Sequence, residues 1–345
     1  MKALRTPQIS TAPLKMRRAL RSLVLGFACG LSAAGCTTPA AYPAHAAPER
    51  DVKRMADAGR PMLALVLSEG SWRAFSHIGV IRVLEEAGVR PDLVVGVSAG
   101  AIVGAIYASG ANASELARIA STADWSRVTE PALPFLIEGA VYRGEGLQAL
   151  VEDLVAGKPM ERLAIPFVTV ATELETGRLV VFRRGETGLA VRASGAVPGR
   201  YAPVRIGTHS YVDGGLVSPL PTETARRLGA DFVIAVDVGY PPAETEIGGF
   251  MSVVYQSFHV QKHRIRQMEA ELADVLIVPD IPRSAVDYGH ENRGMLIAAG
   301  ERTARRELQP LLQKIAAWRN SIQASSRLKS GVRPASPTIA KENNQ

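Results

Sequence analysis

The segment Leu93-Val-Val-Gly-Val-Ser-Ala-Gly-Ala-Ile-Val-Gly-Ala-Ile-Tyr107 has the pattern of a strand, a sharp turn and a helix. Its first four residues form a short apolar run typical of a buried strand, and apolar residues recur at helical spacing from Ile102 onward. Between the two stands a Gly-x-Ser-x-Gly motif formed by Gly96, Ser98 and Gly100, whose glycines leave room for an abrupt reversal of the chain. The pattern predicts that Ser98 is held at a helix N-terminus, where backbone amides and the helix dipole favour developing negative charge.

Similar apolar runs occur on both sides of this segment, with amphipathic stretches such as Val80–Ala87 between them. Strands that are apolar throughout are typical of a mostly parallel sheet covered on both faces, so an α/β fold with three α/β/α layers is predicted. Ligands of such folds bind beyond the carboxyl ends of the strands, here in the loops after Leu67, Val95 and Tyr211. The expected strands are Met62–Leu67, Leu93–Gly96, Pro166–Ala171, Phe232–Asp237 and Val275–Val278.

The net charge at first suggests a protein that binds polyanions. The 345 residues include 40 Lys and Arg against 33 Asp and Glu, which gives a charge of +7, and 47% of them are hydrophobic. That apolar share excludes a disordered or fibrous chain. Most of the excess charge lies within residues 1–35, which contain no Asp or Glu, and beyond Trp318. The part between is close to neutral, so nucleic-acid binding is not expected.

The N-terminus has the features of an export signal. Its basic start precedes Ser22–Ala34, a run of 13 apolar or small residues that is too short for a transmembrane helix of about 20. The stretch Leu31-Ser-Ala-Ala-Gly-Cys36 resembles the lipobox of bacterial lipoproteins, with Ala33 where Leu or Val is usual. In that class the signal is cut before the cysteine and the cysteine is acylated. The alternative is an ordinary secretory signal cut near Ala46 or Ala47.

A lipoprotein signal would consume both cysteines of the chain. Cys29 lies in the removed segment and Cys36 would carry lipid, so no thiol remains for disulfide, redox or zinc chemistry. By the same resemblance, Thr37 after the cysteine implies the outer membrane of a Gram-negative cell, with attachment by lipid rather than by a spanning helix. The expected division is a signal peptide over 1–35, a tether over 36–58, one domain over 59–318 and a disordered tail over 319–345.

An activated serine needs a base and an oxyanion hole. If the base were a histidine, His290 in a Tyr-Gly-His-Glu-Asn loop would be the candidate for a Ser-His-Asp site. His259 and His263 lie one helical turn apart in a basic stretch, which favours a solvated helix face. They have no third ligand at a readable spacing, so no metal site is expected. The same stretch carries Lys262, Arg264 and Arg266.

Asp213, in Tyr211-Val-Asp-Gly-Gly215, is the other candidate base, although Asp-Gly alone also fits a turn. Three motifs that resemble those of the patatin-like phospholipases, in the same order, favour a function for it. The likeness runs from about Leu63 to Leu276, with a motif-bearing core over about 63–237. The motifs are Val95-Gly-Val-Ser-Ala-Gly-Ala-Ile-Val-Gly-Ala105, Val191-Arg-Ala-Ser-Gly-Ala-Val-Pro-Gly199 and Val212-Asp-Gly-Gly-Leu-Val-Ser-Pro-Leu220.

The resemblance implies a serine acyl hydrolase that cleaves lipid esters and needs no metal or organic cofactor. It implies Ser98 as the nucleophile and Asp213 as the proton acceptor of a dyad without histidine. A carboxylate with an ordinary pKa of about 3.9 is a weak base toward an alcohol, so burial would have to raise it and the oxyanion hole would supply much of the catalysis. The glycines expected to let the backbone pass close to the serine turn are Gly96, Gly100, Gly214 and Gly215.

One loop departs from the family's pattern. Members place Gly-Gly-Gly-x-Arg-Gly after the first strand, whereas this chain has Ser68-Glu-Gly-Ser-Trp-Arg-Ala74 before Phe75-Ser-His-Ile-Gly-Val80. The calcium-dependent cytosolic phospholipases of the same superfamily have Ser-Gly-Gly-Gly-Phe-Arg-Ala there. Against that version Trp72 replaces one aromatic residue by another, which leaves Glu69 and Ser71 as the departures.

The altered loop leaves two interpretations. The amides of Gly70 and Ser71, helped by Arg73, can form the oxyanion hole if Ser71 tolerates the dihedral angles that glycine would adopt. Alternatively, the carboxylate of Glu69 impairs catalysis, and the chain is a lipid-binding or envelope-scaffold lipoprotein. His77 is expected to be structural, and family placement puts Tyr142-Arg143 and Pro198-Gly-Arg-Tyr201 at the rim through which an acyl chain enters.

Overall fold

The computed structural model describes residues 42–43, 46–51, 55, 61–129, 140–242, 248–282, 284 and 289–329. The predicted signal peptide and the lipidation site Cys36 lie outside these residues, as does the end of the predicted tail from 330. Among the residues described, no helix combines the length and the apolar character needed to cross a membrane.

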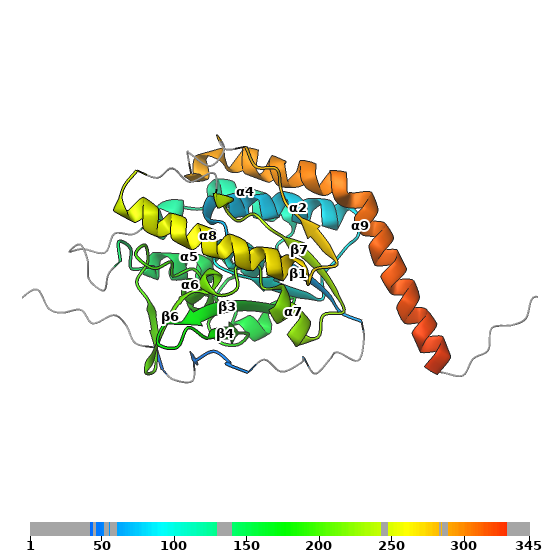
Figure 1. Ribbon diagram of the computed structural model, residues 1–345, viewed down its shortest axis with the longest axis horizontal. Coiled ribbons are helices and arrows are strands. Elements are labelled where there is room, and N and C mark those ends of the chain that lie inside the picture. Colours follow the sequence, from blue (N-terminus) through cyan, green and yellow to red (C-terminus); the bar gives the residue numbers. More distant parts are fainter. Residues whose placement is uncertain are drawn as a thin grey trace, which may run out of the picture. The chain divides into compact units, whose positions relative to one another are not determined.

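The centre of the fold is one eight-stranded sheet, with the order β5-β6-β3-β2-β1-β7-β8 and β4 paired to β3 (Figure 1). The five expected strands are present and run parallel: β1 (Leu63–Leu67), β2 (Leu93–Gly96), β3 (Phe167–Glu173), β7 (Phe232–Val236) and β8 (Val275–Ile277). The other strands, which were not expected, join antiparallel: β4 (Leu179–Phe182), β5 (Val204–Ile206) and β6 (His209–Asp213). β5 and β6 mix polar with apolar residues, so they lack a continuous apolar run. β4 has an apolar run as long as that of β2, but it was not recognised as a strand.

Helices bury both faces of the sheet, which confirms the predicted three layers. Along β1, alternate residues point to opposite faces. Leu65 packs in the core formed with α2 (Phe75–Glu86) and α3 (Ala99–Ala108), and Val66 packs in the core formed with α7 (Thr222–Leu228). The remaining α-helices are α4 (Ala113–Thr122), α5 (Glu145–Leu154), α6 (Thr187–Ser194), α8 (Phe250–Ala270) and α9 (Arg293–Lys329). The 3-10 helices are η2 (Ser71–Ala74), η3 (Trp125–Thr129), η5 (Met160–Arg162), η6 (Gly214–Leu216) and η9 (Gly289–Asn292).

Helix α9 corrects the predicted start of the tail at 319, because the helix continues to Lys329. Trp318 packs on Phe232 of β7 with ring centroids 5.1 Å apart, so the later part of α9 reaches the sheet. Pro310 lacks an amide proton and crowds the preceding turn, which accounts for the change of direction of α9 seen in Figure 1. The residues from Arg319 to Lys329 mix good helix formers with Asn and Ser and show little apolar periodicity, so their composition alone did not separate a helix from disorder.

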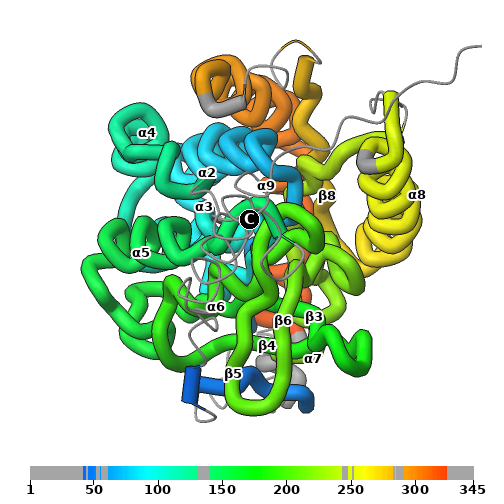
Figure 2. Tube along the Cα trace, turned by 90° about the vertical axis from the view of Figure 1, so that its left-hand side faces the viewer, coloured from blue at the N-terminus to red at the C-terminus, as the bar shows by residue number. Residues whose placement is uncertain are grey.

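Part of the segment 36–58, predicted as a tether, belongs to the folded domain. Tyr42 forms a bridge to β5 and Glu49 forms one to β4, and Figure 2 shows this N-terminal segment beside β5. Arg50 forms an ion pair with Glu173, a carboxylate whose side chain is fully buried at the end of β3. The backbone groups of a strand edge can pair with segments of many different sequences. The Ala and Pro content of 36–58, which suggested a free linker, therefore did not reveal this pairing.

Candidate active site

Ser98 occupies the turn between β2 and α3, as expected. Its φ of 54° and ψ of −124° lie in a region that L-residues rarely adopt, and its amide donates to Ser194 Oγ at 2.9 Å. Gly100 permits the turn, since a Cβ there would lie 2.4 Å from the carbonyl oxygens of Leu67 and Ser68. The side chain of Ser98 is 8% exposed and lines a cavity. The chain therefore holds Ser98 in a strained conformation at the end of the sheet.

The register of three strands brings Asp213 to Ser98. Gly96, the last residue of β2, lies opposite Thr169 of β3. β3 continues beyond that point, and β6 runs back along the extension so that Asp213 lies opposite Ala171. β4 pairs with Thr169–Thr172 on the other side of β3, so β2 and β6 lie end to end along one side of β3 and their ends meet there. This convergence depends on the antiparallel strand β6, which the apolar pattern did not reveal.

Asp213 is fully buried, and only one of its two carboxylate oxygens accepts hydrogen bonds among the described residues. Oδ1 accepts from the amide of Gly215 at 2.7 Å and from Lys262 Nζ at 3.4 Å. Oδ2 has no hydrogen-bond partner at normal distance within the described part of the chain. Burial raises the pKa of Asp213 and the charge of Glu69 adds to the rise, whereas Lys262, the Ser98 hydroxyl and the Gly215 amide oppose it. A carboxylate with a raised pKa is the stronger base that the chemistry of an alcohol requires.

Ser71 meets the condition set by the altered loop. Its φ is 51°, in the left-handed region, where glycine would be unstrained. Ser71 begins η2 directly after Gly70 and lines the cavity together with Ser98. A serine at this position costs roughly 1–2 kcal/mol of strain but keeps its amide. The loop thus has the backbone conformation that the family's glycines would supply.

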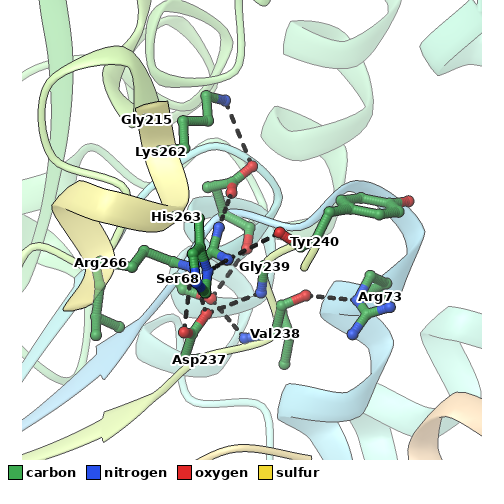
Figure 3. A network of polar contacts seen from close by, with 12 residues as sticks. Ser68, Arg73, Gly215, Asp237, Val238, Gly239, Tyr240, Lys262, His263 and Arg266 are labelled. Carbon is green, nitrogen blue, oxygen red and sulfur yellow. Dashed lines mark hydrogen bonds and ion pairs between the residues drawn. The ribbon is translucent and has the colours of Figure 1, made fainter. Parts of the chain in front are cut away.

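Arg73 is buried and lies against the loop after β7. Its Nε donates to the carbonyl oxygen of Val238 at 2.7 Å, and its guanidinium carbon lies 5.1 Å from the ring centroid of Tyr240 (Figure 3). Tyr240 lines the cavity. These contacts support the cavity wall from behind Tyr240, whereas the sequence suggested direct help to the oxyanion.

Glu69 is paired with two cations of α8. Lys262 Nζ lies 3.4 Å from Glu69 Oε2, and Arg266 Nη1 lies 3.0 Å from Glu69 Oε1. Burial opposes ionisation of Glu69, but Lys262, Arg266 and His259 together outweigh it and hold the pKa of this carboxyl below its usual range. Glu69 is therefore a charge-compensated carboxylate. The charge that suggested impaired catalysis is balanced inside the protein.

The cations of α8 correct the prediction of a solvated helix face. Lys262 is 7% exposed and Arg266 is 3% exposed, and Figure 3 shows both extending from α8 into one polar network. Arg266 Nε also lies 3.1 Å from Asp237, so three carboxylates and two cations alternate from Asp213 to Asp237. The spacing of Lys262 and Arg266 on one helix face, together with an acidic residue in a buried glycine loop, is the signal that could have revealed the network.

The cavity beside Ser98 has a volume of about 670 Å³ and mostly apolar and aromatic walls. Tyr142 and Tyr201 line it, as family placement suggested for the rim, and so does Arg200. Further lining side chains come from η2, α2, α3, η3, α5 and α8: Trp72, Phe75, Ile102, Val103, Trp125, Val128, Leu147, Tyr255 and Phe258. Such walls suit an extended hydrocarbon chain.

Three of the six histidines, His77, His259 and His290, lie in different settings. His77 is fully buried beneath the altered loop, where burial lowers its pKa to about 4 and its Nε2 lies 3.1 Å from the carbonyl oxygen of Ser68. This neutral ring supports the loop, in keeping with a structural part. His259 is half-buried and lines the cavity, with its ring 5.0 Å from that of Tyr240, so it does not lie on a freely exposed helix face as predicted. His290 lies in η9, and its side chain is outside the described part of the chain.

The described residues include no group of three His, Cys, Asp or Glu side chains placed to hold a metal ion. The polar side chains around Ser98 include Asp213, Glu69 and the cations of α8.

Comparison with known proteins covers the segment that contains the site. The patatin-like phospholipase family model matches residues 65–226. An uncharacterized NTE family protein of Mycobacterium tuberculosis is 35% identical over 185 residues, or 54% of this chain and 51% of its own length. Human patatin-like phospholipase domain-containing protein 6 is 36% identical over 185 residues, or 51% of this chain and 13% of that protein. The chain thus spans about half or less of the length of these relatives.

The fold has a counterpart among solved structures. The crystal structure of VipD from Legionella pneumophila superimposes with a TM-score of 0.51 at 14% sequence identity, covering 76% of this chain and 71% of that one. At this identity the likeness concerns the fold alone. Because the family model spans both Ser98 and Asp213, and the relatives agree with it, this chain carries a domain of the patatin-like phospholipase family over residues 65–226.

Proposed function

We propose that this protein hydrolyses carboxylic esters of lipids through a dyad of Ser98 and Asp213. The observation that carries the proposal is the open oxygen Oδ2 of the buried Asp213, close enough for the Ser98 hydroxyl to lower the pKa of that carboxyl. Family membership supports a lipid acyl hydrolase, and the mostly apolar cavity supports an acyl chain as the bound group.

The reaction would proceed in two steps. Asp213 takes the hydroxyl proton of Ser98 as Oγ bonds to the ester carbonyl carbon. The amides of Gly70 and Ser71 stabilise the oxyanion, and the alcohol then leaves with the proton from Asp213. In the second step Asp213 takes a proton from water as the water oxygen attacks the acyl-enzyme. The bond to Ser98 breaks, Oγ recovers that proton, and the fatty acid is released.

Two alternatives have less support. A lipid-binding protein without activity was motivated by Glu69, whose charge Lys262 and Arg266 compensate. A Ser-His-Asp esterase would require His290, and replacing that residue tests it: unchanged hydrolysis would remove the alternative. Phospholipids, lysophospholipids and neutral esters all present the ester and acyl chain that this cavity fits.

The protein would act at a membrane, held by lipid on Cys36 in the outer membrane of a Gram-negative cell. The lipobox-like sequence supports this part of the proposal. A further support is α8, which lines the cavity with Tyr255 and Phe258 and exposes Phe250 on its outside. Incorporation of labelled palmitate into the wild type, and its loss in Cys36→Ser, would test the anchor.

The dyad can be tested with protein that lacks residues 1–36. We expect a fluorophosphonate probe to label wild-type protein and Ser98→Ala to lose both labelling and ester hydrolysis. Asp213→Asn keeps the shape of the side chain but removes the base, so hydrolysis should fall at least about 100-fold. Asp124→Asn, an exposed substitution of the same kind, is the matched control. Hydrolysis by a folded Ser98→Ala or Asp213→Asn variant near the wild-type rate would refute the dyad.

A further inference from the structure

Lys262 is the residue that joins the nucleophile's base to the altered loop. Its Nζ lies 3.4 Å from Asp213 Oδ1 and 3.4 Å from Glu69 Oε2, and the side chain is 9% exposed. A strong charge-assisted hydrogen bond is shorter, about 2.7–2.9 Å. The ammonium group is therefore shared between two carboxylates instead of being bound tightly to one. None of the three family motifs lies in α8, so the resemblance did not imply this contact.

The charges around this pair come from several elements. Asp213 faces Lys262 of α8, Glu69 of the loop after β1 and the hydroxyl of Ser98. Glu69 in turn faces three groups of α8, namely Lys262, Arg266 and His259. Beyond them, Asp237 of the loop after β7 faces Arg266, and Arg73 and Tyr240 adjoin Glu69 and His259.

The two carboxylates act on each other through this shared cation. A buried carboxylate without a counter-ion takes up a proton, and a protonated Asp213 cannot accept one from Ser98. A lysine bound to Asp213 alone would have the opposite effect, because it would lower the pKa of the carboxyl and make the carboxylate a poorer base. Glu69 counteracts this lowering of the pKa, since it attracts the same ammonium group and repels the negative charge of Asp213.

We propose that Lys262 is a positioning residue that keeps Asp213 ionised and directs its Oδ2 toward Ser98, and that Glu69 sets the strength of this hold. The proposal rests on the proposed dyad. Lys262 and the Gly215 amide both bind Oδ1, which leaves Oδ2 as the oxygen that receives the proton. Glu69, one of the residues by which the loop departs from the family pattern, then helps to control the basicity of Asp213.

The two charges predict shifts of opposite sign in the acid limb of the pH–rate profile. Lys262→Met removes the attraction and leaves burial and Glu69, so the limb should move to higher pH by about one unit or more. Glu69→Gln removes the charge that repels the Asp213 carboxylate and leaves Lys262 paired with Asp213 alone. The acid limb should therefore move to lower pH. If either residue were merely structural, its replacement would lower stability without moving the acid limb in these opposite directions.

The experiment measures kcat/KM between pH 3.5 and 9 with an uncharged, soluble ester, by chromatography of the released acid. The free enzyme's base sets the acid limb of this quantity. Arg264→Gln is the matched control, because it removes a cation from the exposed side of the same helix and should leave the limb unchanged. Melting temperatures of all variants accompany the profiles.

A double variant covers the case in which Lys262→Met does not fold, since an unpaired buried charge is strongly destabilising. Glu69→Gln/Lys262→Met removes both charges, and its limb should lie at higher pH than that of Glu69→Gln. If the wild type hydrolyses the ester but the folded variants all show the acid limb at the same pH, this inference is overturned and the proposed function stands. A folded wild type that neither hydrolyses esters nor reacts with the fluorophosphonate probe would overturn the proposed function, and this inference with it.

Discussion

Ser71 carries backbone strain directly beside the reacting groups. Its left-handed φ of 51° is a conformation that costs an L-residue roughly 1–2 kcal/mol. The structure keeps this conformation although a serine occupies the place of a glycine. The shape of the loop is thus imposed by its surroundings, including the buried His77 that contacts the carbonyl of Ser68.

We expect Ser71→Gly to retain ester hydrolysis, because the amide stays in place. Relief of strain should raise the free energy of unfolding by up to about 1 kcal/mol, since the added freedom of the unfolded chain offsets only about 0.4–1 kcal/mol. Ala156→Gly is the control, because Ala156 has a φ of 55° and does not line the cavity. Ser71→Pro lacks the amide and cannot adopt the positive φ, so it should lose hydrolysis. Full activity of a folded Ser71→Pro variant would exclude this amide from the oxyanion hole.

Among the helices and strands, α8 has an unusual distribution of side chains. Its inner face carries the buried groups Lys262, Arg266 and Glu269. Its outer face exposes apolar side chains, and Figure 2 shows the helix on the outside of the fold beside β8. These exposed residues are Phe250 at 81%, Val253 at 50%, Val260 at 52% and Met268 at 57%. Charge inside and apolar surface outside suit a helix that lies between a polar site and a lipid surface.

Replacing the first two of these residues, Phe250→Ser/Val253→Ser, should weaken sedimentation with phospholipid vesicles several-fold. Hydrolysis of esters in vesicles should fall in parallel, whereas hydrolysis of a soluble ester should stay at the wild-type rate, because neither residue lines the cavity. Gln267→Ser, a polar change at an exposed position of α8, is the control. Equal vesicle binding by wild type and double variant would contradict lipid contact through this face.

For the molecule as a whole, a buried carboxyl links stability to pH. Burial raises the pKa of Glu269 to about 8, while hydrogen bonds from the Ser218 hydroxyl and the Leu220 amide oppose the rise. The folded state therefore holds this proton more tightly than the unfolded state does. The stability contributed by the protonated group is full below the unfolded pKa near 4.5 and is lost as the pH rises through about 8.

Thermal unfolding between pH 5 and 9 tests this linkage. The melting temperature of the wild type should contain a decrease between about pH 5 and 8 that levels off above pH 8 and that Glu269→Gln lacks, because glutamine is neutral at every pH and can still bond Ser218 and Leu220. Glu223→Gln, which changes a neighbouring carboxylate, is the control and should keep the decrease. Parallel curves for wild type and Glu269→Gln would show that Glu269 does not titrate in this range.

The sequence by itself determined the parallel strands, the turn at Ser98 and the family, because these depend on local apolar runs and on glycines that close contacts require. Only the tertiary structure decided how β6 brings Asp213 to the end of β2 beside Ser98, and that Lys262 and Arg266 of α8 neutralise Glu69. The physical reason is one of range: a turn is set by neighbouring residues, whereas the environment of a buried charge is set by groups far away in the chain. Lys262 follows Glu69 by 193 positions and Asp213 by 49, and no local pattern records that the three meet.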